Sequence, residues 1–390
     1  MNRKLIRIFI VLSLGIIPLL VVQPALAQCV PDPANAPNQI VNCTGAENDG
    51  IQSAQLNTTV NVANLATVTD AGGPGVSLSN GNVLNNNGGT ISSTSAASAA
   101  VAITAGAANN LLIDINNNTA ASTITSLANA LNATANGDGG IDVYNNGAIT
   151  GNSDAGAGAG FGMNLTDNGG AGSGGIVIYN DDSGVVTANG AGNTAVSATV
   201  SGAGTGAITL TNDGRIDSNA QSAIILTGGT GSGNVTATNN GTVEATSLGI
   251  AVEANEGGNA TVNNAGTATI SSSTGIRVRA DDGNADVNVT GGTVSATSGE
   301  GIFADLSEAT DAGNVEEQRA VKIAGVDRAR GTGGGNRQRR ARVERDLQVA
   351  RQSVARSAGH DAKRHVGRRH AGGRAVDGAI TTPRDDEVDV

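Results

Sequence analysis

The chain has 390 residues, among them 57 glycines, two tyrosines, three phenylalanines and no tryptophan. This composition excludes a core built on large aromatic side chains, so Val, Ile, Leu and Ala have to fill the interior. The net charge of −11 is distributed unevenly: residues 1–27 carry three basic residues, residues 28–314 carry 23 acidic and three basic ones, and residues 315–390 carry 17 basic and 11 acidic ones. These parts are therefore interpreted separately.

Residues 1–27 predict a secretory signal peptide. Basic residues surround the start of an apolar run over residues 5–22, and Ala25-Leu26-Ala27 supplies a small-residue cleavage site. A membrane anchor is the alternative interpretation, but Pro18 interrupts the run. We expect the mature chain to begin at Gln28, outside the cytoplasm.

Residues 28–50 contain both cysteines of the chain, Cys29 and Cys43, separated by a proline-rich stretch. In an exported protein, two cysteines this close together predict a disulfide, and two free thiols are the alternative. A loop closed in this way would cover the first edge of a stacked structure, where unpaired backbone groups otherwise promote aggregation.

Residues 51–314 contain an internal repeat. Its clearest mark is a set of four isoleucines that follow one another at intervals of 26 residues: Ile224, Ile250, Ile276 and Ile302. Apolar and other residues alternate around each of them, which is typical of a strand with one buried side. A repeat of this size predicts stacked units, because one unit can bury its apolar side only against its copies.

Turn sequences of the type Asn-Asn-Gly separate the strands, as at Asn145-Asn146-Gly147 and Asn239-Asn240-Gly241. Antiparallel hairpins in a propeller or barrel are one interpretation of such turns, but a propeller blade needs about 40 residues or more. Three short strands per unit favour an all-β, right-handed parallel β-helix of about ten coils of roughly 26 residues. In this fold the turn asparagines would stack and their amides would bond from coil to coil.

The same period places charged residues above one another on the outer face of the third strand. Glu253, Arg279 and Asp305 occupy equivalent positions in three consecutive coils. We therefore expect Arg279 to lie between two carboxylates, and Arg277 to lie against Phe303 in a cation–π contact.

The repeat region lacks the residues of common catalytic sites. It has no histidine and no lysine, so a Ser-His-Asp triad cannot form there, and we expect no enzyme and no cofactor. The aspartate pairs Asp181-Asp182 and Asp281-Asp282 could bind calcium, but solvated turn carboxylates are the simpler interpretation. We expect a groove that combines clustered carboxylates with an arginine if the protein acts on polysaccharides, and an acidic rod without such a groove if it does not.

The signal peptide, the cysteine pair and coils such as Asn239-Asn240-Gly241-Thr242-Val243 resemble the passenger region of bacterial autotransporters. This resemblance implies an adhesin-like role at the outer surface of a Gram-negative cell, export by the Sec machinery, and ligands on host or neighbouring cells. The barrel that ends such proteins is expected to be absent, because no aromatic residue follows Phe303. A polysaccharide-acting β-helix enzyme and a non-functional, truncated passenger are the alternatives. Without a supplied barrel, the product would stay in the periplasm.

Residues 315–390 break the repeat pattern, since the next isoleucine position holds Arg328. The basic composition and the three histidines, all of which lie in this tail, predict a misread reading frame. A genuine basic tail, disordered or partly helical around Val343–Val354, is the alternative.

Overall fold

The structure is a computed structural model, and the chain divides into two units, residues 1–327 and 328–390. The described residues all belong to the first unit: 29–30, 36–80, 83–107, 111–154, 160–170, 172–190, 192–219, 221–231, 233–307 and 321–324. The predicted signal peptide lies outside them, as does the predicted tail except for its residues 321–324. No helix that could span a membrane occurs among these residues.

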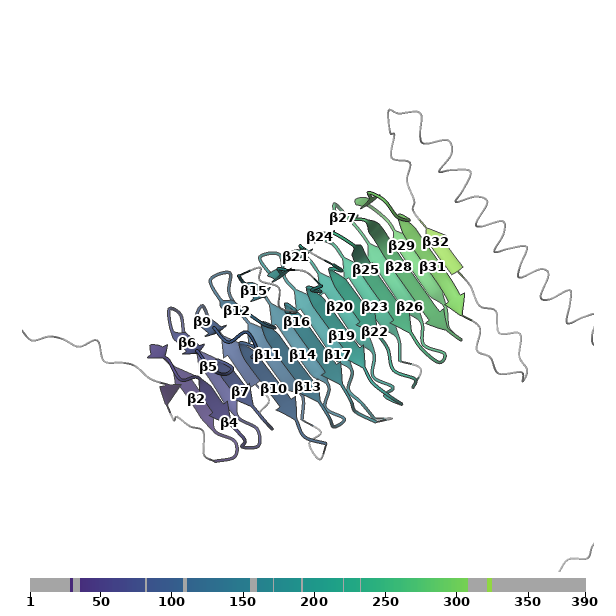
Figure 1. Ribbon diagram of the computed structural model, residues 1–390. Helices are drawn as coiled ribbons and strands as arrows, with labels where there is room; N and C mark the ends of the chain where they lie inside the picture. The colour runs from purple at the N-terminus through teal and green to yellow at the C-terminus, as the bar shows by residue number, and fades with distance from the viewer. Residues whose placement is uncertain are drawn as a thin grey trace, which may run out of the picture. The chain divides into compact units, whose positions relative to one another are not determined.

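The described residues form a parallel β-helix, as the repeat predicts (Figure 1). Each coil contributes one strand to each of three sheets, and each strand pairs in parallel with its counterpart in the next coil. Two of the sheets contain 10 strands and the other contains 12. This agrees with the expected number of about ten coils.

The first sheet begins with an antiparallel pair and continues in parallel. Its strands are β1 (Cys29–Val30), β2 (Ile40–Cys43), β5 (Thr59–Val62), β8 (Val83–Asn86), β11 (Ile113–Asn117), β14 (Ile141–Asn145), β17 (Ile176–Asn180), β20 (Ile208–Asn212), β23 (Val235–Asn239), β26 (Ala260–Asn264), β29 (Ala285–Val289) and β32 (Val321–Ala324). β32 pairs with β29, so this sheet gains a strand inside the segment that the sequence analysis assigns to the tail.

The second sheet follows the first across a short turn in most coils. Its strands are β3 (Ala46–Glu47), β6 (Thr67–Asp70), β9 (Thr90–Ser93), β12 (Thr123–Ser126), β15 (Ala148–Gly151), β18 (Val185–Ala188), β21 (Arg215–Ser218), β24 (Thr242–Ala245), β27 (Thr269–Ser272) and β30 (Thr293–Ala296).

The third sheet contains the isoleucine strands from which the repeat was identified. Its strands are β4 (Ile51–Ser53), β7 (Val76–Leu78), β10 (Val101–Ala105), β13 (Leu131–Ala135), β16 (Met163–Asp167), β19 (Val196–Val200), β22 (Ile224–Thr227), β25 (Leu248–Ala254), β28 (Thr274–Asp281) and β31 (Ile302–Ser307).

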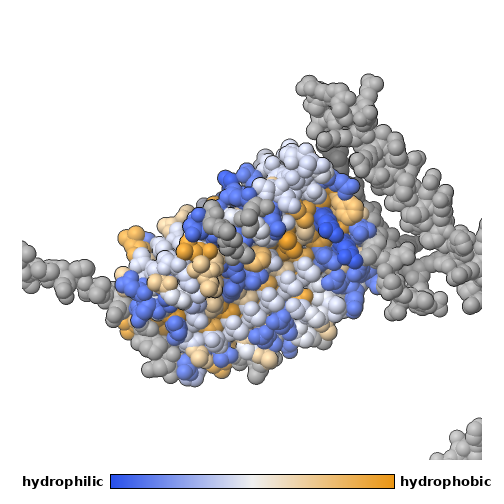
Figure 2. Space-filling model, viewed as in Figure 1, coloured by the Kyte–Doolittle hydropathy of each residue, from blue (hydrophilic) through white to orange (hydrophobic). Residues whose placement is uncertain are grey.

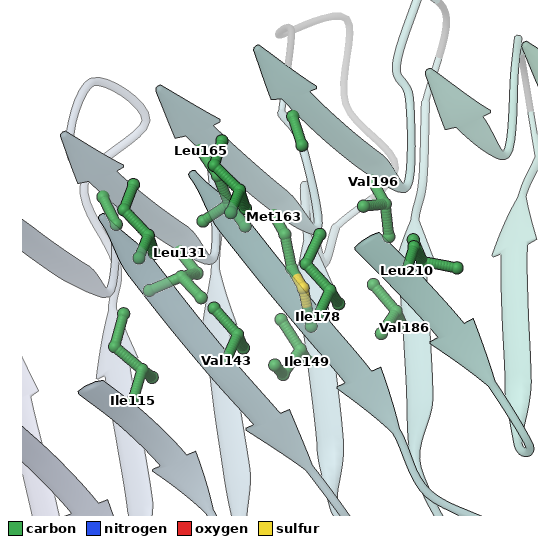
Figure 3. Packing of buried hydrophobic residues seen from close by; sticks show 14 of the residues in the cluster. Ile115, Leu131, Val143, Ile149, Met163, Leu165, Ile178, Val186, Val196 and Leu210 are labelled. Atoms are coloured by element: carbon green, nitrogen blue, oxygen red, sulfur yellow. The ribbon is translucent and has the colours of Figure 1, made fainter. Parts of the chain in front are cut away.

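The core is a column of aliphatic side chains that all three sheets contribute. Figure 3 shows Ile178 of the first sheet, Val186 of the second and Met163 of the third directed into the same interior. All three are fully buried. Successive side chains of a strand point to opposite faces, so every second residue of each strand lies in this core. Small aliphatic side chains in repeated layers thus fill the interior in place of aromatic ones.

Coil length varies along the stack. Register partners on the first sheet are separated by 19 residues near the N-terminus, by 35 between Asn145 and Asn180, and by 25 between Asn239 and Asn264. The strands keep their register throughout, so the additional residues lie at the corners between strands.

Candidate functional site

The predicted disulfide closes the N-terminal end of the stack. Cys29 and Cys43 are register partners in the antiparallel pair β1–β2 and are joined by a disulfide. Both cysteines are buried in the hydrophobic core. β1 pairs with the edge of β2 at the N-terminal end of the first sheet. It therefore covers backbone groups that would otherwise be open to pairing.

The structure stacks the four predicted isoleucines in one ladder. Ile224 pairs with Ile250, Ile250 with Ile276, and Ile276 with Ile302. The first three are fully buried, whereas Ile302, in the last described strand of the third sheet, is partly buried. This ladder is part of the scaffold and carries no chemistry.

Outside the ladder, Glu253, Arg279 and Asp305 are register partners on the outer face of the third sheet. Arg279 forms an ion pair with Glu253 at 3.1 Å and another with Asp281 at 3.5 Å. Arg277 and Phe303 are direct neighbours in the register of the same two strands. Arg279 is 35% exposed, so these charges stay hydrated and contribute little to stability.

A buried asparagine ladder runs along the turn between the first and second sheets, as the repeated Asn-Asn-Gly motif predicts. Each side-chain amide but the last donates to Oδ1 of the asparagine in the next coil, at 2.7–2.9 Å, and the last, that of Asn264, donates to the carbonyl oxygen of Gly291 at 3.1 Å. The ladder comprises Asn86, Asn117, Asn145, Asn180, Asn212, Asn239 and Asn264, all with no exposed surface. Buried amides of this kind hold their place only when bonded on both sides.

The glycine of the motif is required by the closeness of successive turns. A Cβ atom at Gly241 would overlap the carbonyl oxygen of Gly214, and one at Gly214 would overlap the carbonyl oxygen of Gly184. At the glycine positions the stacked turns therefore meet through backbone atoms, and no side chain would fit there.

A cluster of tyrosines and aspartates lies on the outer side of the same corner. Tyr144 and Tyr179 are register partners on β14 and β17, and their rings stack with centroids 5.7 Å apart and planes 18° from parallel. The Tyr144 hydroxyl donates to Oδ2 of Asp181, and the Tyr179 hydroxyl donates to Oδ2 of Asp213, each at 2.5 Å.

These hydrogen bonds change the pKa of both tyrosines and of Asp181. The bond to the Asp213 carboxylate raises the pKa of Tyr179 to about 12, and the bond to Asp181 raises the pKa of Tyr144. The same bond lowers the pKa of Asp181, because the donated proton favours its ionised form. At neutral pH both phenols are therefore donors and Asp181 is a carboxylate.

Asp182 completes a group of three carboxylates. One oxygen each of Asp181, Asp182 and Asp213 lies within 4.8 Å of the others, close enough to share a divalent cation. Two of the three already accept tyrosine hydroxyls, and Asn240 also donates to Oδ1 of Asp213 at 2.7 Å. These bonds hold two of the three carboxylates, Asp181 and Asp213, in place.

An open cavity of about 350 Å³ adjoins the cluster. Asp182, Asp213, Arg215 and Asn240 line it, together with the turn glycines. Arg215 forms ion pairs with Asp217 and Glu244 on the second sheet, both at 2.8 Å. We name this cavity with Tyr144, Tyr179 and the three aspartates the tyrosine–aspartate site.

Comparison with known proteins assigns neither a family nor a function to the chain. No protein-family model, curated protein or solved structure matches the chain. The function of the tyrosine–aspartate site therefore has to be inferred from its own geometry.

Of this site, the sequence predicts only the pair Asp181-Asp182. The tyrosines were missed, although both stand directly before a ladder asparagine, in Tyr144-Asn145 and Tyr179-Asn180. That shared position was the available signal.

Proposed function

We propose that this chain is an exported display scaffold of the adhesin type, similar to an autotransporter passenger, and that it acts by surface contact without catalysis. The observation that carries the proposal is the unbroken stack of coils, in which the interior is closed and the corners vary in length. Such a scaffold can present different loops along one rod, because the pairing of strands between coils does not depend on the length of the loops.

The charge and surface of the rod support this role. Between residues 29 and 307 the sequence has three basic residues, all arginines, in an otherwise acidic surface. Figure 2 shows one face covered largely by polar and weakly hydropathic residues, with smaller apolar areas between them. An acidic, polar rod remains soluble at a cell surface and can offer local contact sites.

Export and attachment can be tested with the full chain. Cell fractionation should find the protein outside the cytoplasm, and beads coated with the folded chain should attach to cell surfaces. Beads coated with heat-unfolded chain are the matched control. Retention in the cytoplasm, or equal attachment by folded and unfolded chain, would contradict the proposal.

A polysaccharide-acting enzyme is the second candidate, and the cavity between Asp182, Asp213 and Arg215 is the observation that favours it. Hydrolysis of a glycosidic bond needs one carboxyl group that donates a proton and a second that attacks or activates water. Here Asp181 is held ionised, both oxygens of Asp213 accept hydrogen bonds, and Arg215 is engaged elsewhere. The geometry therefore favours binding of a polysaccharide over its cleavage. Release of new reducing ends from a polysaccharide incubated with the chain would favour the enzyme instead.

A further inference from the structure

The tyrosine–aspartate site differs from the rest of the outer face on which it lies. Tyr144 and Tyr179 are the two tyrosines of the whole chain, and the structure brings them into contact although 34 residues lie between them. Their register neighbours are Asn116 in the coil before and Thr211 in the coil after. A pair of large rings thus interrupts a column of short polar side chains.

The rings are fixed in place by the aspartates of the following coils. Each phenol donates to a carboxylate in the next turn, so neither ring can rotate freely away from its stacked position. Asn240 fixes Asp213 from the other side. Side chains that are ordered before a ligand arrives reduce the entropic cost of binding.

The register partners of Tyr179 in the two neighbouring coils differ in size, with Tyr144 on one side and Thr211 on the other. Thr211, its register partner in the next coil, is much shorter, so no side chain of equal length stands against the ring on that side. Val177, two residues before Tyr179 on the same outer face, is 45% exposed. Val177 and the ring of Tyr179 therefore form apolar surface on β17, the strand that leads to Asp182 at the rim of the cavity.

Polar side chains and the backbone of the turns line the cavity and offer hydrogen-bonding groups. Asp182 is exposed at its rim, Asp213, Arg215 and Asn240 line it, and the turn glycines contribute only backbone. The charged groups around it are predominantly carboxylates, which repel anionic ligands.

We propose that the tyrosine–aspartate site binds a neutral saccharide, with the C–H face of one sugar ring against Tyr179 and sugar hydroxyls donating to Asp182. An apolar ring face beside carboxylate acceptors matches the two kinds of surface that a pyranose presents. The carboxylates disfavour uronic acids and sulfated glycans. This inference rests on the proposed display function and names the ligand class of one contact site on the rod.

The test is native affinity electrophoresis of the purified full chain through gels that contain a soluble β-glucan, mannan, galactan, polygalacturonate or heparin. We expect retardation by at least one neutral polysaccharide and by neither acidic one. Tyr179→Ala should weaken that retardation at least tenfold, and Tyr179→Phe should weaken it less because the ring remains.

Asp182→Asn should also weaken binding, whereas Asp154→Asn, at another exposed turn carboxylate, should not. Circular dichroism of each variant checks that the fold is retained. The proposal is overturned if no neutral polysaccharide retards the chain, if only the acidic ones retard it, or if both aspartate variants behave alike. If beads coated with Tyr179→Ala still attach to cells, attachment does not depend on this site, and the proposed display function is unaffected.

Discussion

Replacing Asn180 by alanine removes the middle of the buried asparagine ladder. Asn180 accepts from Asn145 and donates to Asn212, both at 2.7 Å, and it also donates to the carbonyl oxygens of Gly184 and Arg215. The substitution leaves one buried donor and one buried acceptor in the neighbouring asparagines without partners. Each such group costs about 1–3 kcal/mol, so we expect Asn180→Ala to lower the free energy of unfolding by about 2–6 kcal/mol.

Urea unfolding followed by far-UV circular dichroism measures this loss, provided that the slope of the transition stays unchanged. The matched control is Asn164→Ala, because Asn164 donates to Asn132 at 3.2 Å on the outer face, where water can replace the lost partner. We expect the control to cost less than about 1 kcal/mol. Asn264→Val should fall between them, because Asn264 is the last member of the ladder and its register partner in the next coil is already Val289. Equal effects of Asn180→Ala and Asn164→Ala would refute the role assigned to the ladder.

Three further outcomes are expected. Reduction of the Cys29–Cys43 disulfide should cost about 3 kcal/mol for a loop of this length, and thiol labelling without reductant should find no free cysteine. Arg279→Ala should change the free energy of unfolding by less than about 1 kcal/mol, because its ion pairs are hydrated, and a larger loss would show that the outer ladder is structural. Tyr179 should ionise near pH 12 by ultraviolet titration, and Asp213→Asn should bring its pKa down towards the ordinary value of about 10. Because the folded-state pKa is the higher one, the stability it contributes is fully present below about pH 10 and is lost as the pH rises through about 12.

The sequence by itself determines the scaffold. Alternation around Ile250 and its equivalents identifies the buried side of each strand, and their constant spacing of 26 residues requires a stack. The recurrence of Asn239-Asn240-Gly241 at the turns also predicts the asparagine ladder, since identical turns in a stack place identical side chains above one another. These features are local and periodic, so one strand and its repeat are enough to predict the stack and the asparagine ladder.

Tertiary structure alone decides the tyrosine–aspartate site. Tyr144 meets Asp181, 37 residues away, and Tyr179 meets Asp213, 34 residues away. These separations follow no fixed period, because the corners of these coils contain different numbers of residues. Backbone hydrogen bonding between β14, β17 and β20 holds the strands in register despite those differences. The physical reason is that register is set by pairing between coils, whereas corner length is free, so contacts across coils of unequal length cannot be read from spacing.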